Sequence, residues 1–376
     1  MANYCPIILF AASTPQKRYF EAMKNSLDLP IILFWYKRWV WPALFLDIPT
    51  TALNNQVFLL IKRKQAVKPN KSPIYWWLFK YFTGLKAQWV YRVAFSYLKR
   101  QEGCLGVWNG KKFRQAIWVE AAKRQQKTVL YFETGPLPGF SAVDTQGVNA
   151  YSSIPRDPNF YRQYPCSINF PLFKLEKTTR PDRLPESYFF VPFQVVEDSN
   201  IFLHSDWITN MRQLYAEIEK HVLAHLDRHF VIKLHPACPE VYDDLILKAA
   251  QTKGRIQFMN DLPSTVLVEH AEAVITVNST VGIEALMRHK KVILLGDALY
   301  GVNEMVQMAS SAEKLHLIIE TLDGWDVDRV LIDQFLCYLK SEYVVVGNAM
   351  NSPDKRHWAS LRNRLLKILP STDQVI

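Results

Sequence analysis

The chain has 376 residues, 49% of them hydrophobic and 21% charged, which are ordinary proportions for a folded protein. A chain of this length exceeds one ordinary core and predicts two domains. The longest apolar run, residues 31–46, is interrupted by Lys37 and Arg38, so it falls short of the roughly 18 uncharged residues of a membrane-spanning helix. The first residues lack the basic lead and long apolar core of a secretory signal. We therefore expect a soluble or membrane-peripheral protein.

The cysteines indicate the redox setting. The chain has five of them, and they form no CxxC pair and no metal-binding spacing: Cys5, Cys104, Cys166, Cys238 and Cys337. This pattern predicts reduced thiols in a cytoplasmic protein rather than a disulfide framework.

The net charge of +10 comes from one segment. Residues 48–101 contain no Asp or Glu and ten Lys or Arg, which leaves 35 basic against 35 acidic residues elsewhere. The same segment is rich in aromatic residues, including Trp76, Trp77 and Trp89. Such a segment suits an anionic membrane surface, because basic side chains meet head groups and Trp lies at the interface. Nucleic acid and a helical pair with solvated basic faces are the alternatives.

Strand-like and helix-like segments alternate in the first half of the chain. We expect strands at 5–13, 29–36, 104–108 and 127–133, and helices at 15–27, 73–100 and 111–126. This alternation predicts a parallel sheet covered by helices. Residues 134–186 interrupt it with eight prolines and little periodicity, so we expect a loop-rich stretch and a linker there.

The alternation resumes in the second half. We expect strands at 186–196, 229–236, 255–260, 271–278 and 290–296, and helices at 208–226, 241–251 and 352–369. The economical architecture is an α/β fold of two Rossmann-like domains facing a central cleft, followed by a C-terminal helix. The expected domain ranges are 1–183, 184–346 and 347–376.

Four groups of polar residues follow predicted strands, where α/β enzymes place their ligands. They are Glu133 in FETGPLPG, Gln194 and Asp198 in VPFQVVEDSN, Lys233 and His235 in VIKLHP, and Asn278, Ser279 and Thr280 in VITVNSTVGIEAL. Each has an ordinary explanation when taken alone, because most carboxylates are surface charges and Asn-Ser-Thr is a good helix cap.

The last two groups are compatible with phosphate binding. Asn278 to Thr280 precede a predicted helix, Gly282 permits close backbone approach, and Glu284 falls on the first turn. His235 could be a core histidine, a metal ligand or a phosphate contact. The phosphate contact is favoured because Lys233 shares its strand face and no second ligand lies at metal spacing. There is no GxGxxG or GxxxxGK[ST] motif, so dinucleotide and P-loop sites are not supported.

Three other histidines, His221, His225 and His229, follow a four-residue spacing near a predicted helix end. We interpret them as a surface stripe, with a metal site as the alternative.

The polar groups occur in an order that resembles the capsule polysaccharide β-Kdo transferases, most closely the KpsS type, which is related to KpsC. The resemblance is carried by GVNAYSSIPRDPNFY (147–161), FQVVEDSNI (193–201), IKLHP (232–236) and residues 260–300, which begin NDLPST and include VITVNSTVGIEALMRHKKVILLG. It is good from about residue 125 to 305 and poor before residue 100.

The resemblance implies a GT-B-like, retaining glycosyltransferase that uses CMP-Kdo without a metal or other cofactor. In such an enzyme the acceptor-side domain comes first and the CMP-sugar domain second. Asp198 matches the proposed nucleophile and Glu133 the candidate acid/base. Because side chains alternate along a strand, Glu197 is expected to point away from the side that Asp198 faces.

The remaining site residues are assigned to substrate. The motif match places His235, with its neighbour Pro236, and Ser279 and Thr280 at CMP-binding positions, and Asn278 and Glu284 adjoin them. Kdo carries a carboxylate, for which Arg156 and Lys233 are the candidate cations, and Asn149 lies in the same motif as Arg156. Gln194 is expected to brace Asp198 or contact the sugar.

The expected partners are CMP-Kdo, a membrane lipid or glycolipid acceptor, the anionic inner-membrane surface and other capsule enzymes, but not nucleic acid. The expected place is the cytoplasmic side of the inner membrane. The family reads glutamate-glycine-aromatic where this chain reads ETGPLPG, and it has a His-rich insertion where the linker here, 162–186, is short. The acceptor therefore stays open between a capsule lipid and a lipopolysaccharide core or other glycan. A transferase for another CMP-sugar and a non-enzymatic nucleic-acid-binding or scaffold protein are the alternatives.

Overall fold

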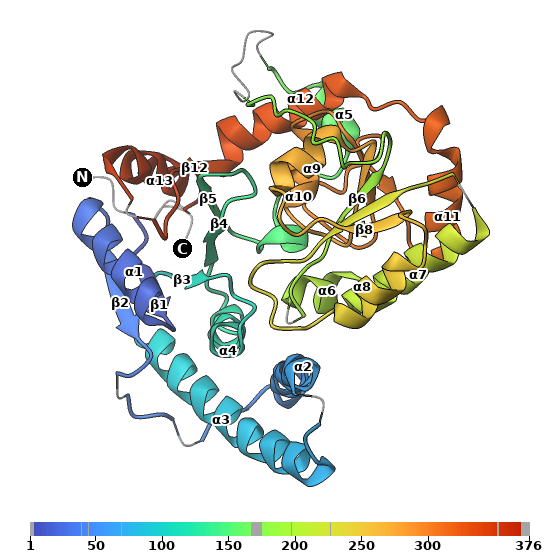
Figure 1. Ribbon diagram of the computed structural model, residues 1–376. Helices are drawn as coiled ribbons and strands as arrows, with labels where there is room; N and C mark the ends of the chain where they lie inside the picture. The colour runs from blue at the N-terminus through green and yellow to red at the C-terminus, as the bar shows by residue number, and fades with distance from the viewer. Residues whose placement is uncertain are drawn as a thin grey trace. The chain divides into compact units, whose positions relative to one another are not determined.

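The computed structural model describes residues 4–38, 40–43, 45–68, 70–166, 175–196, 198–225, 227–351 and 353–369. The chain divides into two compact units, each with its own sheet (Figure 1). The first unit combines residues 1–153 with 342–376, and the second contains residues 154–341.

The sheet of the first unit has the strand order β12-β5-β4-β3-β1-β2. Its strands are β1 (Ile7–Ala11), β2 (Ile31–Trp35), β3 (Cys104–Trp108), β4 (Val129–Thr134), β5 (Phe140–Asp144) and β12 (Val344–Val346). The first four are parallel, whereas β5 runs antiparallel to both β4 and β12. The parallel strands are apolar almost throughout because helices cover both faces of the sheet.

The helices of the first unit form the two covering layers. They are α1 (Thr14–Ser26), α2 (Thr50–Val67), α3 (Pro73–Lys99), α4 (Phe113–Lys123) and α13 (Lys355–Ile368). Ile8 and Phe10 of β1 pack with α2, α3 and α4, whereas Ile7 and Leu9 pack with α1 and α13. This alternation is the two-residue period of a strand buried on both sides. A short 3₁₀ helix, Asn149–Tyr151, follows β5.

The second unit contains a six-stranded parallel sheet with the order β11-β10-β9-β6-β7-β8. Its strands are β6 (Phe189–Pro192), β7 (Phe230–Lys233), β8 (Ile256–Phe258), β9 (Ala273–Thr276), β10 (Lys291–Leu294) and β11 (Gln307–Met308). Counted from β6, this is the Rossmann order 3-2-1-4-5-6, in which the connections reverse direction between β6 and β9. Ligands of such sheets bind at the carboxyl ends of the strands beside this reversal.

The helices of the second unit connect and flank these strands. They are α5 (Pro158–Arg162), α6 (Ser199–His204), α7 (Met211–Ala224), α8 (Asp243–Ala250), α9 (Ser264–His270), α10 (Val281–Leu286), α11 (Ala312–Thr321) and α12 (Arg329–Tyr338). A 3₁₀ turn, Leu322–Gly324, follows α11, and a π-helical turn, Leu339–Tyr343, follows α12 and leads back into the first unit.

The expected fold class is confirmed: two Rossmann-like α/β domains, with a helix near the C-terminus. The arrangement of the two domains around a cleft stays a prediction. The loop-rich stretch expected at 134–186 contains β5 and α5, which its prolines had concealed. The terminal helix begins at Lys355, with Asp354 accepting a hydrogen bond from the His357 N–H (2.9 Å), and the start expected at Ser352 lies outside the described residues.

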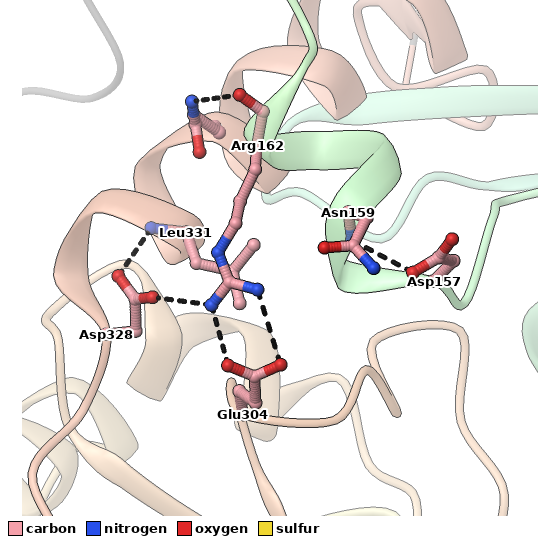
Figure 2. A network of polar contacts seen from close by, with 7 residues as sticks. Asp157, Asn159, Arg162, Glu304, Asp328 and Leu331 are labelled. Atoms are coloured by element: carbon pink, nitrogen blue, oxygen red, sulfur yellow. Dashed lines mark hydrogen bonds and ion pairs between the residues drawn. The ribbon is translucent and has the colours of Figure 1, made fainter.

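The domain ranges of the structure differ from the expected ones. Residues 154–183 belong to the second unit because α5 packs against α12. Arg162 forms ion pairs with Glu304 (2.6 Å) and Asp328 (3.1 Å), as Figure 2 shows. At the other boundary, residues 342–346 return to the first unit together with the C-terminal helix, since β12 pairs with β5.

The prediction that all the thiols are reduced is wrong for two cysteines. Cys166 and Cys337 form a disulfide, and Cys5, Cys104 and Cys238 are free. The bonded residues are 171 positions apart and meet because Cys166 follows α5, which packs against α12. Sequence spacing does not reveal such a pair.

Candidate active site

Three predicted site residues meet at the reversal point of the second sheet. Gln194 and Asp198 follow β6, and Asn278 follows the neighbouring strand β9. The Gln194 Nε2 donates to Asp198 Oδ2 (2.9 Å) and to Asn278 Oδ1 (3.0 Å), and its Oε1 accepts from the Asn278 N–H (3.2 Å). Gln194 is buried, so one amide side chain links the ends of two strands.

Asp198 is held by a second contact. It is the N-cap of α6, where its Oδ1 accepts from the Asn200 N–H (2.8 Å). The Asn200 carbonyl in turn accepts from Asn278 Nδ2 (2.9 Å). Both carboxylate oxygens therefore have a fixed donor, which orients the group while it stays half-buried. The opposite orientation expected for Glu197 concerns a residue outside the described ones.

The turn after β9 is built around Ser279. The Ser279 Oγ accepts from the Val281 N–H (3.3 Å), and its carbonyl accepts from the Tyr300 hydroxyl. Thr280 is exposed and its side chain does not cap α10. A Cβ on Gly282 would come within 2.3 Å of the Tyr300 Oη, so the group that closely approaches this glycine is the Tyr300 side chain, and an approach of phosphate stays a prediction.

Glu284 lies on the first turn of α10, as expected. Burial raises the pKa of its carboxyl group, and the positive charge of Arg288 opposes this shift. A protonated Glu284 could donate a hydrogen bond, whereas an ionised one could only accept.

The Lys-x-His-Pro segment divides into a half-buried and an exposed part. The Lys233 Nζ, at the end of β7, donates to the carbonyls of Asn260 (2.6 Å) and Leu262 (2.7 Å). Lys233 thus anchors the loop after β8. His235 and Pro236 are exposed in a turn. The His235 Nδ1 accepts from the Ala237 N–H (3.1 Å), so a neutral ring carries its proton on Nε2.

Glu133 lies in the first unit, next to the end of β4. Its Oε2 accepts a short hydrogen bond from Asn109 Nδ2, and its Oε1 accepts from the Thr134 N–H (2.9 Å). Burial raises the pKa of this carboxyl group, while the Asn109 amide and the Thr134 N–H pull it down, with smaller contributions from Lys112 and Lys111. A carboxyl group with a raised pKa is suited to proton transfer.

Two predicted substrate residues lie in the connection between the units. Asn149 begins the 3₁₀ turn with a φ of 56°, in a loop whose Asp144 carboxylate accepts from the Ser153 N–H (2.8 Å) and hydroxyl (2.9 Å). The Arg156 Nη1 donates to the Ile154 carbonyl (2.6 Å). Both candidate cations for the Kdo carboxylate, Lys233 and Arg156, therefore have backbone carbonyl partners.

Sequence reasoning missed Asn109, Asn200 and Asn260. Asn109 adopts a φ of 65° after β3 and is followed by Gly110 at 76°, so Asn-Gly after an apolar strand was the available signal for a turn. Asn260 Oδ1 accepts from the Leu234 N–H (2.9 Å). Neither Asn200 nor Asn260 has a comparable local signal, because Asn278 and Leu234, the distant residues that they contact, follow other strands.

The fold and this site define a two-domain α/β protein whose second unit has a braced carboxylate at the reversal point of a Rossmann-ordered sheet. Residues 172–316 of that unit match the family described as capsule polysaccharide biosynthesis protein. This part of the chain is therefore similar to the capsule polysaccharide biosynthesis family, in agreement with the resemblance of its motifs.

Several curated proteins are similar to this chain. Protein FixF of Sinorhizobium fredii is 32% identical over 66% of this chain and 61% of its own length. The capsule polysaccharide export protein KpsS of Escherichia coli is 30% identical over 48% of this chain and 64% of its own length. The capsule polysaccharide modification protein LipB of Neisseria meningitidis is 28% identical over 34% of this chain. The chain thus spans less than two thirds of the length of each of these relatives.

Solved structures show only distant likeness. The β-Kdo 2,7-transferase of Thermosulfurimonas dismutans KpsC aligns over 88% of this chain and 89% of its own, with 14% identity and a TM-score of 0.48. The S. aureus MnaA–UDP structure aligns over 98% and 99%, with 10% identity and a TM-score of 0.38. Likenesses of this size do not establish a shared activity.

Proposed function

We propose that the protein is a retaining β-Kdo transferase that uses CMP-Kdo and passes Kdo to a membrane lipid or glycolipid acceptor. The observation that carries the proposal is the position of the Asp198 carboxylate. It accepts hydrogen bonds from the Gln194 side chain and the Asn200 N–H, and the same Gln194 amide also donates to Asn278. It lies where a Rossmann-ordered sheet binds ligands, within the range that matches the capsule family.

Transfer takes place in two displacements. In the first, an Asp198 oxygen attacks the anomeric carbon of Kdo, the bond from that carbon to the phosphate oxygen breaks, and CMP leaves with the electron pair. In the second, an acceptor hydroxyl attacks the same carbon, the bond to Asp198 breaks, and the hydroxyl proton passes to Glu133. Two inversions at one carbon retain its configuration.

The leaving phosphate is the negative charge that the site must stabilise. His235, with its Nε2 exposed, and the Ser279–Thr280 turn are the groups proposed to contact CMP. Lys233 is proposed to position the loop at Asn260 rather than to touch phosphate, because two carbonyls already bind its ammonium group. The scheme needs neither a metal nor a further cofactor.

The test is the capture of the sugar on the enzyme. Protein incubated with CMP-Kdo alone should gain the mass of one Kdo, located on a peptide containing Asp198. Asp198→Asn should abolish the adduct and the turnover, whereas Glu133→Gln should still form the adduct but transfer it roughly 10²–10⁴-fold more slowly. Asp206→Asn, an exposed carboxylate beyond α6, and Glu102→Gln are the matched controls.

Other outcomes point elsewhere. Full turnover by Asp198→Asn would show that the nucleophile is wrongly assigned. An adduct with CMP-sialic acid and none with CMP-Kdo would indicate another CMP-sugar. The absence of a thermal shift with CMP, together with salt-sensitive nucleic-acid binding, would favour the non-enzymatic alternative.

The acceptor side of the proposal rests on α3. Exposed apolar side chains follow one another at three- and four-residue spacing along this helix: Ile74, Trp77, Leu78, Tyr81, Phe82, Leu85 and Trp89. This spacing places them on one face, and Trp77 and Phe82 are 66% and 62% exposed. The opposite face, with Ala87, Tyr91 and Ala94, is buried against the unit.

We propose that this α3 stripe lies on an anionic membrane. Figure 1 shows α3 beside α2, whose Lys62 lies over the ring of the exposed Phe58 (4.7 Å). Apolar rings next to lysines, in a segment without acidic residues, match the boundary between head groups and acyl chains. Of the described helices, none is long and apolar enough to span a bilayer.

A hollow lined by α3, α4 and the residues after β2 is the proposed place for the acceptor head group. Its volume is about 160 Å³, and its lining includes Lys37, Arg38, Arg114, Tyr36 and Trp89. The Arg114 guanidinium lies over the Tyr36 ring at 4.5 Å. Three cations around a small hollow suit a phosphate or carboxylate.

Vesicle binding tests the α3 stripe separately from the chemistry. The protein should float with vesicles that contain phosphatidylglycerol and not with phosphatidylcholine alone. Trp77→Ser combined with Phe82→Ser should weaken binding at least about tenfold, since each buried side chain contributes about 1.5–3 kcal/mol. Leu247→Ser on α8, where Leu247 is 70% exposed, is the control. Unchanged binding by the double variant would refute this surface.

The hollow is tested by kinetics. Arg38→Gln should raise the KM for the lipid acceptor and leave adduct formation from CMP-Kdo unchanged, with the exposed Arg18→Gln as the control. An unchanged KM would exclude the hollow as the acceptor site.

A further inference from the structure

Helices α7 and α11 bring three histidines and two glutamates together in the second unit. Glu217, His221 and His225 follow one another at four-residue spacing along α7 and its C-cap, and His316 and Glu320 have the same spacing on α11. Residues four apart share a helix face, so two polar rows face each other. We call these five residues the α7–α11 cluster.

The donor atoms of the cluster converge. One donor atom each from His221, His225 and Glu320 lie within 4.8 Å of one another. The His225 Nε2 and Glu320 Oε1 are 2.9 Å apart. The His221 ring stacks on the His225 ring with centroids 4.6 Å apart. The His316 ring lies edge-on to the His221 ring, with centroids 5.3 Å apart.

His221 is the buried centre of the cluster, with no exposed surface. The earlier interpretation of His221, His225 and His229 as a surface stripe is therefore wrong for His221, because α11 covers it. Among the described residues, neither ring nitrogen of His221 has a hydrogen-bond partner, and the Glu217 Oε2 also has none. Buried polar atoms are normally bonded, and leaving them without a partner is unfavourable.

We infer that the α7–α11 cluster binds one divalent transition metal ion of the zinc class. His221, His225 and Glu320 supply two imidazole nitrogens and one carboxylate oxygen, which is a donor set that zinc accepts, and two histidines four residues apart on a helix are a known zinc-binding arrangement. His316 is the neighbouring candidate for the fourth position, with its Nε2 3.9 Å from Glu217 Oε2.

The geometry is close to that of a bound ion. Ligand atoms at about 2.0–2.2 Å from zinc in a tetrahedron lie roughly 3.3–3.6 Å apart. The His225–Glu320 pair is near that separation at 2.9 Å, and a donor atom of His221 lies within 4.8 Å of both. The ion would join α7 to α11. It shares no residue with the Asp198 site, so a metal here is compatible with transfer chemistry that needs none.

The test uses full-length, tag-free protein treated with a chelator and then titrated with Co²⁺ and Zn²⁺. We expect one ion per chain, a visible Co²⁺ absorption band of tetrahedral type that Zn²⁺ displaces, and a rise in the unfolding temperature. His225→Ala and Glu320→Gln should each weaken Zn²⁺ binding at least about 100-fold, because losing even a partner of a ligand typically weakens it 10–100-fold. Both side chains are about two fifths exposed, so these variants should fold.

His229→Ala is the matched control, because His229 continues the four-residue spacing but is not among the converging donors. It should bind Zn²⁺ as the unmodified protein does. Absence of stoichiometric binding would overturn the inference. So would binding that His225→Ala and Glu320→Gln leave unchanged, or binding that His229→Ala abolishes.

Discussion

Gln194 offers the sharpest test of how the candidate site is built. Replacing it with Met keeps the side-chain volume but removes three hydrogen bonds: those from Nε2 to Asp198 Oδ2 (2.9 Å) and Asn278 Oδ1 (3.0 Å), and that from the Asn278 N–H to Oε1 (3.2 Å). Gln194 is only 5% exposed, so water cannot readily replace them.

The expected loss can be estimated from these contacts. A hydrogen bond to a charged group contributes about 1.5–3 kcal/mol, and a buried N–H left without a partner costs about 1–3 kcal/mol. Gln194→Met should therefore lower the free energy of unfolding by about 2–4 kcal/mol. It should also slow adduct formation, because Asp198 keeps only its Asn200 contact and loses its fixed orientation. A loss of about 1.4–2.8 kcal/mol in the transition state corresponds to roughly 10–100-fold in rate.

Two measurements separate stability from chemistry. Urea unfolding gives the free energy of unfolding. Single-turnover mass spectrometry with CMP-Kdo gives the rate of adduct formation, measured without urea at a temperature where the variant is folded. Gln257→Met on β8 is the control, since the Gln257 amide donates to the nearby Gly254 carbonyl (2.8 Å) and not to a residue of the candidate site. A Gln194→Met variant that forms the adduct at the normal rate would refute the view that this amide orients the nucleophile.

Three further predictions follow from individual contacts. In denaturant, three cysteines should react with iodoacetamide without reductant and five after reduction, and five reactive thiols without reductant would contradict the disulfide. Cys337→Ser should lower the free energy of unfolding by about 3–5 kcal/mol. Asn109→Gly keeps the positive φ but removes the side-chain amide, which lowers the raised pKa of Glu133. In this variant, the part of the pH–rate profile in which the transfer rate rises with pH should shift to higher pH. An unshifted profile would exclude Glu133 as the base. Gly282→Ala should destabilise the protein by about 1–3 kcal/mol in thermal unfolding, since its Cβ would overlap a buried phenol, and a neutral result would contradict that packing.

The sign of the Glu133 prediction follows from its role. The base form of Glu133 accepts the acceptor proton, so the transfer rate rises as pH increases through the pKa of this group. Burial places that pKa above the ordinary value of a glutamate, and the Asn109 amide counteracts part of the shift. Removing the amide therefore moves the limb upward, and Glu133→Gln should eliminate it.

Much of the fold follows from local patterning. The apolar strands of both sheets are continuous or nearly continuous hydrophobic runs, because helices cover both faces, and such runs are visible without a structure. Strand β5 and helix α5 were missed, since the prolines and glycines around them give the local signal of a loop. Helix α13 was expected near its observed position, but its cap is Asp354, one of several capping residues that compete in that stretch.

Local patterning was enough to show which residues lie at strand ends, because strand length and side-chain alternation are local, and the motifs pointed to the capsule polysaccharide biosynthesis family. Which of those ends meet depends on the tertiary structure. Gln194 and Asn278 are 84 residues apart and become neighbours through the order of β6 and β9. The same holds for the carbonyls that bind Lys233 and for the histidine and glutamate donors on α7 and α11. Contacts of this kind depend on how parallel strands and helices are ordered in space, which no local spacing encodes.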